Sequence, residues 1–234
     1  AGIPILQGYG MTEGCVTCAN RPEDNKVGSI GRPFEGIEMK IAEKDGEVLI
    51  RGKNVMQGYY NNPEETAKVL DNEGYYHTGD VGYQDNDGHF YITDRLKDLF
   101  KLSNGKYVAP LQVESLLKQS PLVSQPVVVG SGRKQVGALI VPDWDALKEE
   151  MKAEGHHATG SREELCEDPQ FIKRVQRDAI ELTRELSDYE RVKRVYLLPR
   201  EFSIDKGEMT PTLKIKRGVI DEKFSEAIDE ICGS

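Results

Sequence analysis

The density of turn-forming residues changes sharply along the chain, and this change constrains the fold more than any other feature. In residues 1–94, short apolar stretches are separated at close intervals by Gly, Pro, Asn and Asp. This spacing is typical of short strands joined by turns, because such stretches are too short to form a long amphipathic helix. From residue 97 onward, helical periodicities alternate with apolar runs. The sequence therefore predicts a β-rich part followed by a mixed α+β part.

Local patterns in the β-rich part predict two hairpins and one short helix. Apolar segments at 37–41 and 47–51 flank Asp45-Gly46, a dipeptide typical of hairpin turns. A second hairpin is expected for 81–84 and 90–92, joined by 85–88. Asn62 should cap a helix that begins at Pro63 and ends at Leu70, with two glutamates in its first turn.

The N-terminal segment, AGIPILQGYG, is interpreted as a strand entered midway, so that the chain begins inside a domain. It lacks the charged start and the long apolar stretch of a signal peptide.

The second part is expected to contain four main helices and three strands. The period of the apolar positions indicates helices, and the short apolar runs indicate buried strands. The expected helices are 110–119, 144–154, 169–186 and 221–231, and the expected strands are 125–130, 135–141 and 194–198.

Charge and hydropathy exclude several classes of protein. Among 234 residues, 31 Lys and Arg oppose 40 Asp and Glu, which gives a net charge of −9. Such a surface argues against a dedicated nucleic-acid binder, although a local nucleotide site needs only a few cations and backbone amides. No apolar run approaches the roughly 20 residues of a transmembrane helix.

The cysteines and histidines indicate no metal centre. The four cysteines form no disulfide framework, which fits a reducing cytosol. Cys15 and Cys18 have the spacing of metal ligands, but the sequence offers no second pair, so we interpret them as ordinary small residues. The adjacent His156 and His157 are interpreted as solvated.

The sequence contains no glycine-rich loop that fits a nucleotide-binding fingerprint. The segment 128–132, VVGSG, follows a strand but precedes another strand, so a hairpin turn is favoured over a dinucleotide loop. The chain contains no GxxxxGK[ST] phosphate loop.

Two segments in the β-rich part could carry chemistry. Tyr9, Gly10, Thr12 and Glu13 combine an aromatic face, a flexible glycine, a hydroxyl and a carboxylate, a set that can stack a base, contact phosphate and hold Mg²⁺. A turn with exposed Thr and Glu is equally compatible. Asp80 is expected just after a tight turn, where it would accept ribose hydroxyls or only cap its own turn.

Two further segments are rich in cations. Residues 94–101, DRLKDLFK, precede the turn dipeptide Asn104-Gly105 and could form an exposed strand or a solvated connector. Residues 210–217, TPTLKIKR, form a basic cluster that could bring a lysine to a carboxylate or phosphate. A plain basic loop before the last helix is the alternative.

In order and spacing, the four segments resemble the C-terminal motif series of adenylate-forming enzymes. This superfamily includes acyl-CoA synthetases, firefly-type luciferases and the adenylation domains of peptide synthetases. The resemblance covers the whole chain and includes VGSIG with Pro33, the segment 46–52 and the segment 58–60, GYY. KLSNGKYVAP and TPTLKIKR are most similar to long-chain fatty-acyl-CoA synthetases.

The resemblance implies a domain organisation. Residues 1–96 would be the β-rich tail of the large adenylation domain, and residues 97–234 the small mobile α+β C-terminal domain, with a hinge at Lys97. The family's phosphate loop and most of its acyl pocket lie upstream of YGMTE and are absent, so the chain is expected to be a fragment that is inactive alone. Leu213 stands where the family usually has glycine.

The resemblance also implies a reaction and residue roles. A fatty acid and ATP would give an acyl-adenylate, and coenzyme A would then displace AMP. Lys214 would be the catalytic lysine, Thr12 would contact the α-phosphate and Glu13 would ligate Mg²⁺. Tyr9 and Gly10 would contact the nucleotide, Asp80 and Arg95 would hold the ribose, and Gly105 would line the coenzyme A channel.

The implied partners are fatty acid, ATP, coenzyme A and the N-terminal part of the same enzyme, in the cytoplasm, with peripheral membrane contact compatible and no nucleic acid. Two alternatives stay open: an acyl-AMP ligase that loads a carrier protein, and a non-catalytic interaction module with the same fold.

Overall fold

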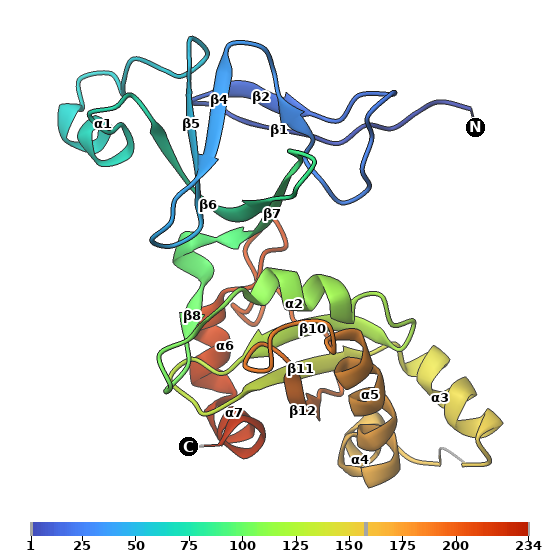
Figure 1. Ribbon diagram of the computed structural model, residues 1–234. Coiled ribbons are helices and arrows are strands. Elements are labelled where there is room, and N and C mark those ends of the chain that lie inside the picture. The colour runs from blue at the N-terminus through green and yellow to red at the C-terminus, as the bar shows by residue number, and fades with distance from the viewer. Residues whose placement is uncertain (1, 157–158, 234) are drawn as a thin grey trace. The chain divides into compact units, whose positions relative to one another are not determined.

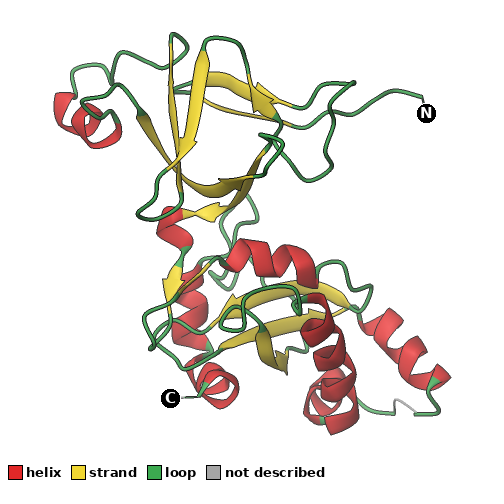
Figure 2. Ribbon diagram, viewed as in Figure 1, coloured by secondary structure: helices red, strands yellow, loops and turns green. Residues whose placement is uncertain are grey.

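The computed structural model describes residues 2–156 and 159–233, and the chain divides into two compact units, 1–98 and 99–234. Figure 1 labels most elements of both units, and Figure 2 shows that the first is built mainly of strands and loops while the second mixes strands with helices. The expected change from β-rich to α+β structure is confirmed.

The first unit holds two antiparallel sheets. In each sheet, neighbouring strands are hydrogen-bonded in sequence order. The small sheet contains β1 (Gly8–Met11), β2 (Cys15–Ala19) and β3 (Arg32–Pro33), and the larger contains β4 (Ile37–Ile41), β5 (Glu47–Gly52), β6 (Tyr76–Gln84) and β7 (Phe90–Arg95).

Both predicted hairpins and the predicted helix of this unit are confirmed. β4 pairs with β5, and β6 pairs with β7, each in antiparallel register. Helix α1 (Pro63–Val69) begins where expected, and the side chain of Asn62 accepts a hydrogen bond from the Glu65 amide. A cap that accepts an N-terminal amide offsets the lack of a backbone partner there.

The expected N-terminal strand is wrong in its position. Residues 2–7 form no strand, and β1 begins at Gly8. Ile3 and Ile5 are 82% and 91% exposed, so the apolar run that suggested a strand packs against little else in the described chain. An apolar run without a hydrogen-bonding partner does not form a strand by itself.

The second unit is built on a three-stranded sheet of order β10-β11-β12. β10 (Val123–Val129) and β11 (Val136–Pro142) are antiparallel, and β12 (Val192–Leu197) runs parallel to β11. The VVGSG segment leads into the loop of the β10–β11 hairpin, which confirms the hairpin interpretation. A short ladder of β8 (Phe100–Lys101) and β9 (Tyr107–Val108) precedes the sheet.

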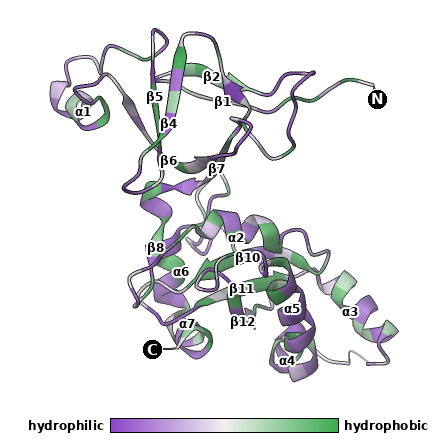
Figure 3. Ribbon diagram, viewed as in Figure 1, coloured by the Kyte–Doolittle hydropathy of each residue, from purple (hydrophilic) through white to green (hydrophobic). Residues whose placement is uncertain are grey.

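Side chains that alternate along the strands of this sheet pack into two hydrophobic cores, one on each face of the sheet. Val128, Ala138 and Ile140 pack with helices α2 (Pro110–Leu117), α3 (Trp144–Ala153), α4 (Arg162–Glu167) and α5 (Pro169–Leu182). Val127, Val129 and Leu139 pack with α6 (Arg217–Lys223) and α7 (Ser225–Cys232). Both sheet faces are therefore buried, which explains why β11 is buried at every position and mainly hydrophobic in Figure 3.

Two helix predictions in this unit need correction, and one helix was missed. α5 ends at Leu182 instead of 186, where the buried Thr183 hydroxyl donates to the Ala179 carbonyl. α4 was not expected, although its capping box of Ser161 and Glu164 is a readable signal. The expected helix 221–231 is two helices, α6 and α7, separated at Phe224.

Candidate functional site

The predicted nucleotide segment lies in the β1–β2 hairpin. Tyr9 and Gly10 belong to β1, whereas Thr12 and Glu13 lie in the turn that follows. A Cβ atom on Gly10 would lie 2.3 Å from the carbonyl oxygen of Cys15 across the hairpin. Glycine is therefore required here by close strand packing, a reason different from the flexibility suggested by the sequence.

Tyr9, Asp80 and Arg95 meet in one hydrogen-bonded cluster. The Tyr9 hydroxyl donates to Oδ2 of Asp80, and the Arg95 Nε lies 2.6 Å from Asp80 Oδ1. Asp80 is only 6% exposed, while the side chain of Arg95 is 55% exposed. Burial, followed by the hydrogen bond to Asp80, raises the pKa of Tyr9. The cluster thus joins an aromatic ring, a buried carboxylate and an accessible guanidinium.

The local surroundings of Asp80 differ from the expectation. Asp80 lies in the middle of β6, not after a tight turn, although Gly79 before it has a φ of +70°. Its amide donates to the Thr78 hydroxyl at 3.0 Å, and that hydroxyl donates to the Val48 carbonyl at 2.7 Å. Asp80 directs its carboxylate to Tyr9 and Arg95, so the alternative of a side chain that only caps its own turn is wrong.

Glu13 is held by Tyr59, a residue whose role the sequence did not indicate. The Tyr59 hydroxyl donates to Glu13 Oε1 at 2.9 Å, and the Met56 amide donates to the Glu13 carbonyl at 2.7 Å. Burial, followed by a hydrogen bond with Tyr59, raises the pKa of Tyr76. The contacts of Glu13 and Tyr59 therefore extend to Tyr76 in β6. The GYY phrase was visible in the sequence, but nothing in it indicated which carboxylate Tyr59 contacts.

The donor set suits magnesium. Glu13 offers a half-buried carboxylate next to the exposed Thr12 hydroxyl. Within residues 2–156 and 159–233, no group of three or more His, Cys, Asp or Glu side chains could hold a metal ion. Mg²⁺ commonly binds through one or two carboxylates together with substrate phosphates and water, and a single Glu13 fits that mode. Cys15 is exposed and Cys18 is buried, both as free thiols.

The remaining predicted residues of the connecting region lie close to the division between the units. Lys97 is exposed in a single 3₁₀ turn, Leu96–Asp98, the last element of the first unit. Gly105 lies in the β8–β9 turn of the second unit, where its amide donates to the Leu102 carbonyl at 2.9 Å.

The structure gives a backbone reason for glycine at position 105. Its φ is +88°, in the left-handed region that other residues rarely adopt. A Cβ atom there would meet nothing closer than the Lys101 Cε at 3.7 Å, so space alone does not require glycine.

Lys214 is presented at the end of a small hairpin in the second unit. The bridge between Met209 and Ile215 forms its stem, and the Thr210 amide donates to the Lys214 carbonyl at 2.8 Å. Lys214 itself is exposed. Leu213 has a φ of +58°, a conformation that favours glycine, which accounts for the glycine usual at this position in the family that the sequence resembles.

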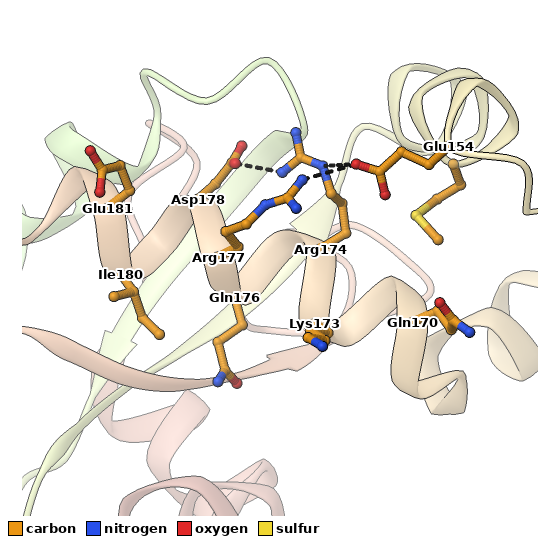
Figure 4. Close-up of a pocket in the computed structure, with 10 residues that line it drawn as sticks. Glu154, Gln170, Lys173, Arg174, Gln176, Arg177, Asp178, Ile180 and Glu181 are labelled. Atoms are coloured by element: carbon orange, nitrogen blue, oxygen red, sulfur yellow. Dashed lines mark hydrogen bonds and ion pairs between the residues drawn. The ribbon is translucent and has the colours of Figure 1, made fainter.

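A groove lined by other residues lies elsewhere in the second unit. It has a volume of about 760 Å³ between α3 and α5, and none of the predicted site residues line it. Figure 4 shows four of its charged side chains paired, with Arg174 and Arg177 directed at Glu154 and Arg174 also at Asp178. His156 is half-buried, His157 lies outside the described residues, and no described helix is long and apolar enough to cross a membrane.

Two family models match the chain. A model described as AMP-binding enzyme matches residues 1–60, and one described as AMP-binding enzyme C-terminal domain matches residues 97–233.

Curated relatives and solved structures agree with these matches. The long-chain-fatty-acid–CoA ligase FadD15 of Mycobacterium tuberculosis is 37% identical over 233 residues, which cover 99% of this chain and 38% of the relative. Human long-chain-fatty-acid–CoA ligase 1 is 37% identical over 246 residues, covering 98% and 35%. The adenylation domain of a carboxylic acid reductase from Segniliparus rugosus, bound to AMP and a co-purified carboxylic acid, has 26% identity and a TM-score of 0.68, covering 96% and 34%. The chain thus spans well under half the length of these proteins.

Proposed function

Because the chain belongs to the AMP-binding enzyme family, we propose that it forms the C-terminal part of an AMP-forming long-chain fatty-acid–CoA ligase. The observation that carries the proposal is the cluster of Tyr9, Asp80 and Arg95, in which Tyr9 and Asp80 are 71 residues apart in the sequence. The similarity to fatty-acid–CoA ligases at 37% identity supports the substrate class.

The first half-reaction joins the fatty acid to AMP with release of pyrophosphate. In our proposal the Tyr9 ring stacks on adenine next to Gly10, while Asp80 accepts hydrogen bonds from the ribose hydroxyls. The exposed guanidinium of Arg95 donates to the ribose. Asp80 suits this role because its carboxylate is already ordered and shielded from water, so little reorganisation is needed when the nucleotide binds.

Negative charge develops at the fatty-acid carboxylate and the α-phosphate during this step. Thr12 would donate to the α-phosphate, and Lys214 would place its ammonium near the developing charge. Glu13 would hold Mg²⁺, which when bound neutralises charge on the phosphates. Thr12 and Lys214 are exposed, and Glu13 is half-buried, so all three side chains are accessible at the surface of their units.

The second half-reaction transfers the acyl group to the thiol of coenzyme A. We propose that residues 97–234 act as a small mobile domain that turns about a hinge at Lys97, removes Lys214 and presents Gly105 to the pantetheine arm. The 3₁₀ turn at the hinge supports this, since short irregular elements absorb changes in backbone dihedral angles.

The proposal also assigns partners and location. The upstream part of the same polypeptide would supply the phosphate loop and the acyl pocket. The four free cysteines fit a cytoplasmic location. Peripheral contact with a membrane is compatible with this location.

The proposal is tested in the full-length enzyme by separating the two half-reactions. Fatty-acid-dependent exchange between ATP and pyrophosphate measures adenylation, and conversion of a supplied acyl-adenylate measures thioester formation. Lys214→Ala should slow adenylation by about 10²–10³-fold and leave thioester formation nearly unchanged. Equal loss of both half-reactions would refute the assigned role of Lys214.

The acceptor and the isolated chain provide the remaining tests. A carrier protein that accepts the acyl group in place of coenzyme A would instead establish an acyl-AMP ligase. A protein that binds neither AMP nor an acyl-adenylate analogue would be an interaction module. The 234-residue chain alone should form no acyl-CoA above a protein-free blank.

A further inference from the structure

The hairpin that carries Lys214 has a rigid base of its own. The Lys216 amide donates to the carbonyl of Glu208 at 2.8 Å, and the bridge between Met209 and Ile215 continues the stem. Both bridge residues pack against the core below α6 and α7. Glu208 begins the stem of the hairpin, so the position of Lys214 depends on how Glu208 is held.

Glu208 is the most deeply buried carboxylate in the second unit among the described residues, with its side chain 0% exposed. A buried carboxylate is strongly destabilising unless charged donors surround it. Arg200 donates to it in bidentate fashion at 2.7 and 2.9 Å, and Lys223 donates at 2.9 Å. The Ser203 amide adds a fourth donor at 3.2 Å.

These donors come from both sides of the hairpin. Arg200 follows β12, and Lys223 is the last residue of α6. Lys223 also donates to the carbonyl of Lys206 at 2.9 Å, so one ammonium joins the loop to the helix. The hydrogen bonds from Arg200 are the main reason that the pKa of Glu208 is lowered to about 2. The carboxylate is therefore ionised at physiological pH.

The exit of the hairpin is held in a similar way. Arg217 donates to both carboxylate oxygens of the buried Glu114 at 2.9 and 3.0 Å, and to the Val128 carbonyl at 3.3 Å. Lys214 thus lies on a short segment that is anchored before it by the buried Glu208 and after it by Arg217, which is bound to the buried Glu114. Its ammonium remains exposed while its backbone is tied to the sheet.

We propose that Glu208 is a positioning residue that fixes the location of Lys214 through the hairpin stem, without touching substrate. The inference rests on the proposed role of Lys214 in adenylation. Charge stabilisation falls off steeply when a catalytic group is displaced, and a misplacement of about 1 Å can reduce a rate by about 10²-fold. A hairpin released from Arg200 and Lys223 would allow displacement of that size.

The test uses Glu208→Gln in the full-length enzyme, because glutamine keeps the shape and removes the charge. We expect adenylation to fall by about 10- to 100-fold and conversion of supplied acyl-adenylate to stay within about twofold. Hydrogen exchange at the amides of Thr210, Lys214 and Lys216 should accelerate, since these amides close the hairpin.

The matched control is Asp178→Asn. Asp178 is a half-buried carboxylate of the same unit, hydrogen-bonded to Arg174 at 2.5 Å and Ser120 at 2.6 Å, on α5 at the opposite sheet face. It should leave both half-reactions and the hairpin amides unchanged.

Three results would overturn the inference. Glu208→Gln could leave adenylation unchanged, it could slow both half-reactions equally, or it could fail to accelerate exchange in the hairpin. The Lys214→Ala variant separates this inference from the proposed function. If that variant keeps its adenylation rate, the proposed role of Lys214 fails as well. If only Glu208→Gln keeps it, the proposed function stands and the positioning role of Glu208 does not.

Discussion

Replacing Glu208 by glutamine should change how the stability of the second unit depends on pH. The pKa of Glu208 falls from its ordinary value of 4.5 to about 2, chiefly because Arg200 donates to the carboxylate. A folded-state pKa below the unfolded value adds stability that is present above pH 4.5 and is lost as the pH falls toward 2. Glutamine does not titrate and should lack this component.

The magnitude follows from the two pKa values. A fall from 4.5 to about 2 corresponds to about 3.4 kcal/mol of stability when the carboxylate is ionised in both states. At pH 3.5 the same two values leave about 2 kcal/mol of this contribution. Between pH 6 and pH 3.5, the stability gap between the native chain and the variant should therefore shrink by about 1.4 kcal/mol.

The single tryptophan makes this measurable. Trp144 is buried and belongs to the second unit, so its fluorescence reports the unfolding of the unit that contains Glu208. Urea unfolding at pH 6 and pH 3.5 would give the free energy of each protein at each pH. A stability gap that stays constant between the two pH values would show that Glu208 does not hold its charge against Arg200 and Lys223, and would refute the reasoning.

Three further predictions concern the site itself. Tyr59→Phe should raise the Mg²⁺ concentration that half-saturates adenylation by about tenfold, because Glu13 loses its hydroxyl donor; an unchanged Mg²⁺ titration would contradict this. Asp80→Asn should weaken AMP binding about 10- to 100-fold in an equilibrium titration, since it removes the buried charge to which we assign the ribose hydroxyls; native affinity would exclude the assigned role. Gly105→Ala should destabilise the second unit by about 1 kcal/mol, because the strain at positive φ exceeds the entropy gained in the unfolded chain; an unchanged urea midpoint, followed by Trp144, would show that the turn tolerates a side chain.

Local signals in the sequence were sufficient for most of the secondary structure. The Asn62 cap and Pro63 fixed the start of α1, and the Asp45-Gly46 turn placed the β4–β5 hairpin, because both depend on residues adjacent in the chain. The errors occurred where local pattern lacked a tertiary partner. The apolar residues of 2–7 form no strand, and the helical period of 169–186 continues past the point where Thr183 ends α5.

The sequence by itself determined the family resemblance, the two kinds of structure and the residue types of the candidate site. Motifs and periodicities are properties of neighbouring residues, so they can be read without a fold. Only the tertiary structure decided which of these residues meet. Tyr9 reaches Asp80, Glu13 is held by Tyr59, and Glu208 is enclosed by Arg200 and Lys223. Such contacts depend on strand register and on burial, and a charged residue looks the same in a sequence whether its fold leaves it in water or surrounds it with donors.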